Sequence, residues 1–207
     1  MKTEAHSEPR LQAPGAGLPY FQRLVAKHIA LPRYWKKTSW DQATAFFQAE
    51  GEKISKLARS IDANSQMIRK LVNPIQGLED SSRYWSVAMA LEHLVITGRG
   101  MLSIILDLTS EKQSGVKIDI AKVKPLGGKP PAEVLSLFEN FQQEYIGRVK
   151  NEAKNRVSKL THEHPWFGDL TAHQWHGLAA IHQRTHRLQV QAIISNLRVT
   201  QSGRQKS

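Results

Sequence analysis

The sequence predicts an all-α protein built as a four-helix bundle. In four separate segments, apolar residues recur every three or four positions, a spacing that gathers them on one face of a helix. No segment shows the sustained alternation of apolar and polar residues that is typical of strands. Because each amphipathic face needs a partner, four such helices are expected to close around one core, in an antiparallel or a crossover arrangement.

Capping and breaking residues bound the four helices. Ser39 and Gln42 have the spacing of a capping box, as do Thr171 and Gln174, and Pro131 suits the first position of a helix. A stretch that contains glycine and proline is expected to form an irregular linker between the second and third helices, over residues 109–130. The helices themselves are expected over residues 39–61, 82–108, 131–160 and 171–198.

Further segments flank the bundle, which is expected to span residues 39–198. Residues 1–19 are expected to form a flexible tail, and residues 199–207 a basic tail. Residues 20–38 form a basic, aromatic extension that can fold as a short helix. Its apolar surface has two interpretations, a homodimer interface or a fifth helix that packs on its own bundle. The aromatic residues concerned are Tyr20, Phe21, Tyr34, Trp35 and the adjoining Trp40.

The composition excludes several classes of protein. The chain has no cysteine, which excludes disulfides, cysteine nucleophiles and thiolate-bound zinc. The longest apolar stretches, residues 87–96 and 101–108, are too short and too interrupted to span a bilayer. The N-terminal residues lack the apolar core of a secretory signal. We therefore expect a cytoplasmic protein without a membrane segment, in which any metal is held by nitrogen and oxygen.

The net charge of +11 raises the alternative of an anionic partner. The basic residues, however, are spread along the predicted helices and the tails, without the pattern of a recognition helix. This spread favours solvated helix faces over a nucleic-acid interface. The alternative to an enzyme is therefore a non-catalytic helical bundle that binds nucleic acid or another polyanion.

Two histidines on the fourth helix carry the most specific functional signal. His182 and His186 lie four residues apart on the apolar face, at positions where leucines are expected. Residues at this spacing stand one above the other, about 6 Å apart, so two ring nitrogens can converge on one metal ion. Gln183 follows His182, which excludes the HExxH motif of a zinc protease. The alternative is a pair of neutral histidines that are hydrogen-bonded inside the bundle.

His93 is the candidate third ligand, because it lies on the core face of the second helix. Three histidines with open positions are typical of catalytic zinc and also suit nickel or iron. Glu92 points about 100° away from His93, and we expect it at the surface or beside a ligand. Glu50 interrupts the apolar stripe of the first helix and is a candidate catalytic base, or simply part of an exposed helix turn.

Three sequence motifs occur in order along the predicted bundle. They are WSV at 85–87 followed by LEHL at 91–94, HPWFGDLTAHQW at 164–175, and IHQRTHRLQ at 181–189. In order and spacing, over about residues 39–198, the chain resembles the DinB/YfiT-like superfamily of metal-dependent enzymes. The resemblance implies a four-helix bundle with a long crossover, commonly a dimer, and a metal held by one histidine of the second helix and an HxxxH of the fourth. These roles fall on His93, His182 and His186.

The resemblance also implies a class of chemistry. A divalent transition metal with open positions lowers the pKa of a bound water or thiol, which suits hydrolysis or thiol transfer on a small-molecule substrate. Characterised relatives include transferases and isomerases that act with the low-molecular-weight thiols mycothiol or bacillithiol. In this family the HPWFGDLT stretch lies beside the metal, so His164, Trp166, Phe167 and Asp169 are candidates for the pocket wall. A turn and helix cap without a role in the site is the alternative.

Overall fold

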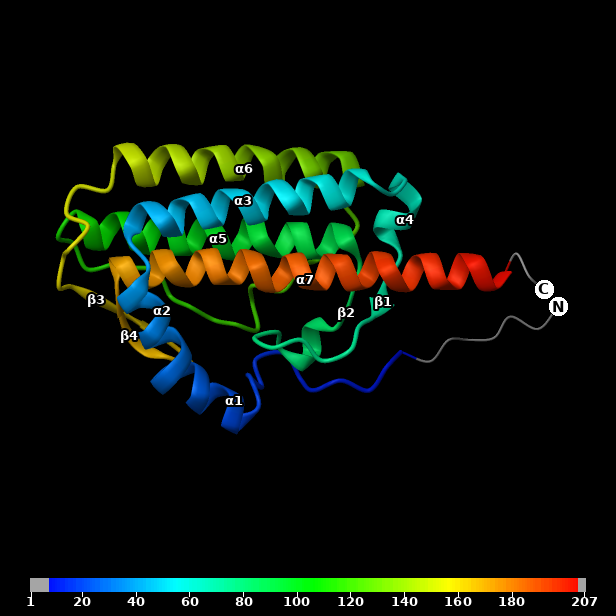
Figure 1. The fold of residues 1–207 in the computed structure, drawn as a ribbon, viewed down its shortest axis with the longest axis horizontal. Helices are drawn as coiled ribbons and strands as arrows, with labels where there is room; N and C mark the ends of the chain where they lie inside the picture. The colour runs from blue at the N-terminus through cyan, green and yellow to red at the C-terminus, as the bar shows by residue number, and fades with distance from the viewer. Residues whose placement is uncertain (1–7, 205–207) are drawn as a thin grey trace.

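The computed structural model of the protein describes residues 8–204, and its centre is a bundle of four long helices (Figure 1). They are α3 (Trp40–Arg59), α5 (Val87–Thr109), α6 (Pro131–Asn151) and α7 (Ala172–Arg204). Helix α3 packs on α6 and α7, and α5 packs on the same two helices, so the four enclose one apolar core. The predicted all-α four-helix bundle is confirmed.

The direction of the helices requires a long connection between α5 and α6. These two neighbours run in the same direction, opposite to α3 and α7, so residues 110–130 pass back along the bundle (Figure 1). Side-chain hydrogen bonds fasten this crossover to α5. The Gly127 N–H donates to the Glu92 carboxylate at 2.9 Å, and the Ser114 hydroxyl donates to Asp107 at 2.8 Å. The expected irregular linker is therefore a crossover with defined anchors.

Helix starts agree with the capping signals. Both bonds of the Ser39–Gln42 capping box are present before α3. Gln174 likewise accepts the N–H of Thr171 at 2.8 Å before α7. Helix α5 begins later than predicted, because Ser86 caps it and residues 80–86 take other conformations. These residues form the short 3-10 helix η2 (Asp80–Ser82) and strand β2 (Tyr84–Trp85), which pairs with β1 (Lys70–Leu71) after helix α4 (Ala63–Met67).

The third predicted helix was too long. Helix α6 ends at Asn151 rather than near residue 160, and the side chain of Val157 is 78% exposed. Val157 therefore continues the apolar spacing without facing the core, whereas Leu160 packs against the core from outside a helix. The stretch that was interpreted as a turn and helix cap belongs to an antiparallel hairpin of β3 (Thr161–His164) and β4 (Gly168–Thr171), in which Gly168 has a φ of +77°.

The N-terminal extension is helical and lies on the bundle. It consists of α1 (Tyr20–Val25), the π-helix η1 (Ala26–Ala30) and α2 (Leu31–Lys37). Helix α2 packs on α7 at Gly177, where a Cβ atom would lie 3.0 Å from the rings of Tyr34 and Trp35. This packing agrees with the fifth-helix interpretation. Tyr20 and Phe21 are nevertheless 69% and 77% exposed, and the homodimer stays a prediction.

The segment expected as a flexible tail makes specific contacts over its described part. The Gln12 N–H donates to Asp80 at 2.8 Å, the Gly17 N–H donates to Glu79 at 3.0 Å, and Leu18 is buried. Residues 8–19 therefore lie along the protein, whereas residues 1–7 fall outside the described part. At the other end, α7 continues to Arg204 instead of giving way to a tail at residue 199, and residues 205–207 lie outside the described part.

Helix α5 is long and apolar enough, by length and composition, to cross a membrane. However, 61% of its apolar window is buried inside the protein, between α6 and α7. The apolar composition of α5 is therefore explained by its position in the core of the bundle.

Two glycines of α5 provide a test of the bundle packing. A Cβ atom at Gly98 would lie 2.3 Å from Cζ of Phe141 on α6, whereas a Cβ atom at Gly100 would have no neighbour within 4 Å. We expect Gly98→Ala to lower the free energy of unfolding by about 1–3 kcal/mol through overpacking. The matched control Gly100→Ala should raise it by up to about 1 kcal/mol through helix propensity. Urea unfolding measures both values, and equal effects would contradict the close approach of α5 and α6.

Candidate metal centre

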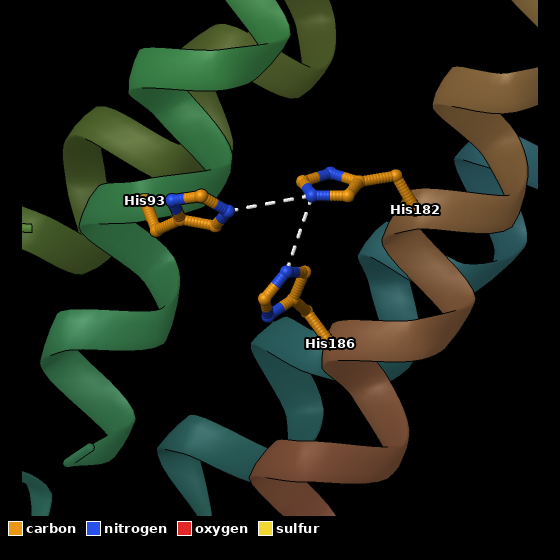
Figure 2. Close-up of side chains that lie close together, drawn as sticks. All are labelled: His93, His182 and His186. Carbon is orange, nitrogen blue, oxygen red and sulfur yellow. Dashed lines mark hydrogen bonds between the residues drawn. The ribbon is translucent and has the colours of Figure 1, made fainter. Parts of the chain in front are cut away.

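Three histidines from two helices converge inside the bundle. His93 comes from α5, and His182 and His186 come from α7 (Figure 2). The Nε2 atom of His182 lies 3.3 Å from Nε2 of His93 and 3.2 Å from Nε2 of His186. All three ligand atoms lie within 4.8 Å of one another. The three histidines singled out in the sequence therefore lie close enough to bind one metal ion.

Burial keeps the three rings neutral. His93 and His186 are 7% and 3% exposed, and His182 is half-buried. Removal from water lowers the pKa of His186 to about 4 and lowers the pKa of His93 and of His182 well below the ordinary value. At neutral pH each ring therefore carries one proton and one nitrogen lone pair.

Hydrogen bonds to the outer ring nitrogens fix where two of those protons lie. Nδ1 of His93 is 2.8 Å from the carbonyl oxygen of Val123, and Nδ1 of His186 is 2.7 Å from Oε1 of Gln189. The Gln189 amide is oriented in turn, because its Nε2 donates to the Ser82 carbonyl at 2.6 Å. Since both partner oxygens can only accept, both Nδ1 atoms are protonated. Nε2 of His93 and Nε2 of His186 are therefore bare lone pairs directed at His182.

Hydrogen bonding among the three rings cannot satisfy this arrangement. If His182 is protonated at Nε2, its single proton serves one of two acceptors, and if it is protonated at Nδ1, three lone pairs face one another. A buried acceptor without a partner is costly. A metal ion would satisfy all three nitrogens, and separations of 3.2 and 3.3 Å are close to the ~3.3 Å between two nitrogens that each lie ~2.0–2.1 Å from a tetrahedral zinc ion. The donor set therefore fits a transition metal.

Aromatic and charged neighbours hold the rings in place. Trp85 of β2 packs against the rings of His93 and His186, with centroid separations of 5.0 and 5.9 Å. Nζ of Lys124, in the crossover, lies 5.4 Å from the Trp85 ring and forms an ion pair with the buried Glu79. Because Glu79 also accepts the Gly17 N–H, one carboxylate ties the crossover and the N-terminal segment to the edge of the site.

The three histidines open into a cavity of about 160 Å³ between α5, α7 and the crossover. Its wall is largely apolar, and the crossover contributes six residues to it: Val116, Lys117, Ile118, Ile120, Val123 and Lys124. This part of the wall was not predicted from the sequence. The available signal was the short alternation VKIDI at residues 116–120, which presents one apolar face without belonging to a sheet.

The residues of the HPWFGD hairpin divide into two groups. His164 and Trp166 line the cavity beside His182, whereas Phe167 stacks on His164 at 4.7 Å and packs against the core. Asp169 is exposed and does not line it. Burial lowers the pKa of His164 to about 4, and its Nδ1 accepts the Trp166 N–H at 3.1 Å, so its Nε2 carries the proton. His164 is thus a neutral hydrogen-bond donor in the cavity wall.

The structure does not bring Glu50 to the histidines. Its carboxylate is 2% exposed and pairs with Arg187 of α7 at 2.8 Å and with Lys53 at 2.6 Å. Burial alone would raise the pKa of Glu50, but the hydrogen bonds from these two cations lower it below the ordinary value. Glu50 does not line the cavity, and it is an interhelical ion-pair partner rather than part of an exposed helix turn. Glu92, beside His93, instead anchors the crossover through Gly127.

The burial of another histidine, His176, was not predicted. His176 of α7 is fully buried, and its ring nitrogens bond the hydroxyl groups of Tyr145 and Thr44, both at 2.9 Å. Its ring also stacks on Trp40 at 4.4 Å. Both ring nitrogens of His176 have hydrogen-bond partners, so this buried histidine needs no metal ion. The three histidines of the candidate metal centre differ from it in this respect.

No protein-family model and no curated protein matches the chain. Among solved structures, the crystal structure of TT2238, described as a four-helix bundle protein, is similar with a TM-score of 0.48 and 20% sequence identity. The match covers 74% of this chain and 99% of that chain. A likeness this distant does not bear on function.

The Glu50 ion pair gives a prediction that separates stability from metal binding. We expect Glu50→Gln to lower the free energy of unfolding at pH 7 by about 2–3 kcal/mol, because Arg187 loses a charged partner. A lowered pKa stabilises the fold above the ordinary glutamate pKa, and this contribution is lost as the pH falls through the lowered value. The difference from wild type should therefore shrink in acid.

The matched control is Glu52→Gln, which changes an exposed carboxylate on the same helix and should alter stability by less than about 0.5 kcal/mol. Zinc affinity, measured by competition with a chelating dye, should be the same in both variants and in wild type. A tenfold loss of zinc affinity in Glu50→Gln alone would instead assign Glu50 to the metal site.

Proposed function

We propose that this protein is a metal-dependent enzyme similar to the DinB/YfiT-like superfamily, in which His93, His182 and His186 hold a divalent transition metal. The proposal rests on one observation: the Nε2 atoms of the three rings face one another with at most one proton to share, too few for each to have a hydrogen-bond partner. Satisfied core histidines, such as His176, need no ion, whereas these three rings lack a complete set of hydrogen-bond partners without one.

The donor set and the cavity indicate the type of chemistry. An all-nitrogen set suits zinc, nickel or iron. When bound, the metal would act as a Lewis acid that lowers the pKa of a water molecule or a thiol and so supplies a nucleophile near neutral pH. The chain's own residues add a cavity of small-molecule size and a neutral donor, His164, that can bond an oxygen of the substrate. We therefore propose hydrolysis or thiol transfer on a small molecule.

Metal addition tests the proposal directly. Zinc, nickel or iron(II) should raise the free energy of unfolding of the wild-type protein, by about 2.7 kcal/mol when the free metal is at 100 times its dissociation constant. His186→Gln should lose this stabilisation. The matched control His28→Gln, an exposed position on η1, should keep it. Equal stabilisation of the two variants, or none in wild type, would refute a metal site at these histidines.

The partner of the His186 ring provides a second test. Gln189 accepts the Nδ1 proton of His186, which directs Nε2 toward the other two rings. We expect Gln189→Leu to weaken zinc binding about 10- to 100-fold, the effect typical of removing such a partner. Zinc titration by calorimetry at matched folded fractions measures the change. An unchanged affinity would mean that the Gln189 bond does not orient the ring for a metal.

A further inference from the structure

The metal centre borders a second apolar cavity that belongs to the N-terminal extension. This cavity has a volume of about 380 Å³ and lies between α7 and the helices α1, η1 and α2. It shares lining residues with the cavity at the three histidines, which makes the two spaces neighbours. The shared residues are Gly77, Met101, His164, Trp166 and His182.

The wall of the second cavity is suited to an apolar chain. The extension contributes Leu18, Ala26 and Leu31, and helix α7 contributes Leu178 and Ile181. No Asp or Glu occurs among the described residues that line it, and its arginine, Arg184, is solvent-exposed. Polar side chains also line the cavity, namely those of Gln22, Tyr34, Gln76 and Thr185. An alkyl chain that lies against the apolar part of the wall would gain from leaving water.

The two cavities differ in volume and in their contact with the three histidines. The cavity at the histidines, with about 160 Å³, is close to the ~150 Å³ of an engineered cavity that holds one benzene molecule. It therefore accommodates a reactive group and a few carbons. The second cavity has more than twice that volume and contacts the triad only through His182. A longer substrate that uses both cavities would lie against the residues they share, which include His182 and Trp166.

We propose that the substrate is a single-chain amphiphile, whose polar head reaches the three histidines and whose alkyl tail occupies the cavity under the N-terminal helices. The inference rests on the proposed function for the head group, while the tail cavity stands on its own geometry. It assigns the extension, which lies outside the four helices, the role of selecting substrates by chain length.

Binding of alkyl hydroxamates to the zinc-loaded full-length protein tests the proposal. The hydroxamate head is a zinc ligand, and acetohydroxamate, hexanohydroxamate and octanohydroxamate differ only in their tails. Calorimetry should show the dissociation constant falling by about three- to fourfold for each additional methylene that becomes buried. A constant affinity across the series would overturn the proposal.

Two matched variants locate the tail. Ala26→Trp fills the second cavity, so it should abolish the gain of octanohydroxamate over hexanohydroxamate and leave acetohydroxamate binding as in wild type. Ile29→Trp adds an indole to the same π-helix at an exposed position that does not line the cavity, and it should behave as wild type. If Ala26→Trp keeps the full gain, the tail lies elsewhere and the proposal fails.

A metal-free arm separates this inference from the proposed function. In the protein without added metal, n-octanol should shift the methyl NMR signals of Ala26, Leu178 and Ile181, and Ala26→Trp should suppress these shifts in the other two residues. Octanol binding without any zinc binding would refute the metal centre but keep the apolar cavity. Zinc binding with no octanol shifts and no dependence on chain length would leave the metal centre intact and overturn the amphiphile.

Discussion

Three neutral imidazole nitrogens that face one another with at most one proton between them constrain the whole centre of this molecule. Two of the rings are held in this state by acceptors on their far side, the Val123 carbonyl and the Gln189 amide. One acceptor belongs to the crossover and the other to α7, so the positions of both segments are coupled to the orientation of the rings. Trp85 packs against the same rings and limits their movement.

The bundle places α5 and α7 at the separation that this cluster needs. Helix α6 packs closely on two sides, because Gly98 of α5 and Gly51 of α3 leave room for Phe141 and Gln142. Helix α3 is tied to α7 by the buried ion pair of Glu50 with Arg187, one residue beyond His186. The scaffold thus fixes the backbone that carries the histidines through contacts that do not involve the histidines themselves.

Both the helices and the three metal-binding candidates could be predicted from the sequence, because the apolar face of a helix repeats with a visible period. Polar rings at His93, His182 and His186 stand out because they interrupt apolar faces whose period is visible. The end of α6 was mispredicted because exposed apolar residues such as Val157 continue the spacing by coincidence. The Val123 contact left no signal, since any residue has a carbonyl group and the path of the crossover depends on tertiary packing.

The crossover has a consequence for how such a protein can diversify. Because α5 and α6 are parallel neighbours, the chain must travel the length of the bundle between them (Figure 1). On the way it forms part of the wall of the cavity at the histidines. Part of this wall consists of Lys117, Ile120 and Val123, which do not belong to the hydrophobic core, whereas Val116 and Ile118 line the cavity and also pack against the core. Substitutions at Lys117 or Ile120 can therefore change the shape of the cavity without removing a ligand or a core residue, so selectivity can vary at a few positions of a connecting segment while the four helices stay the same.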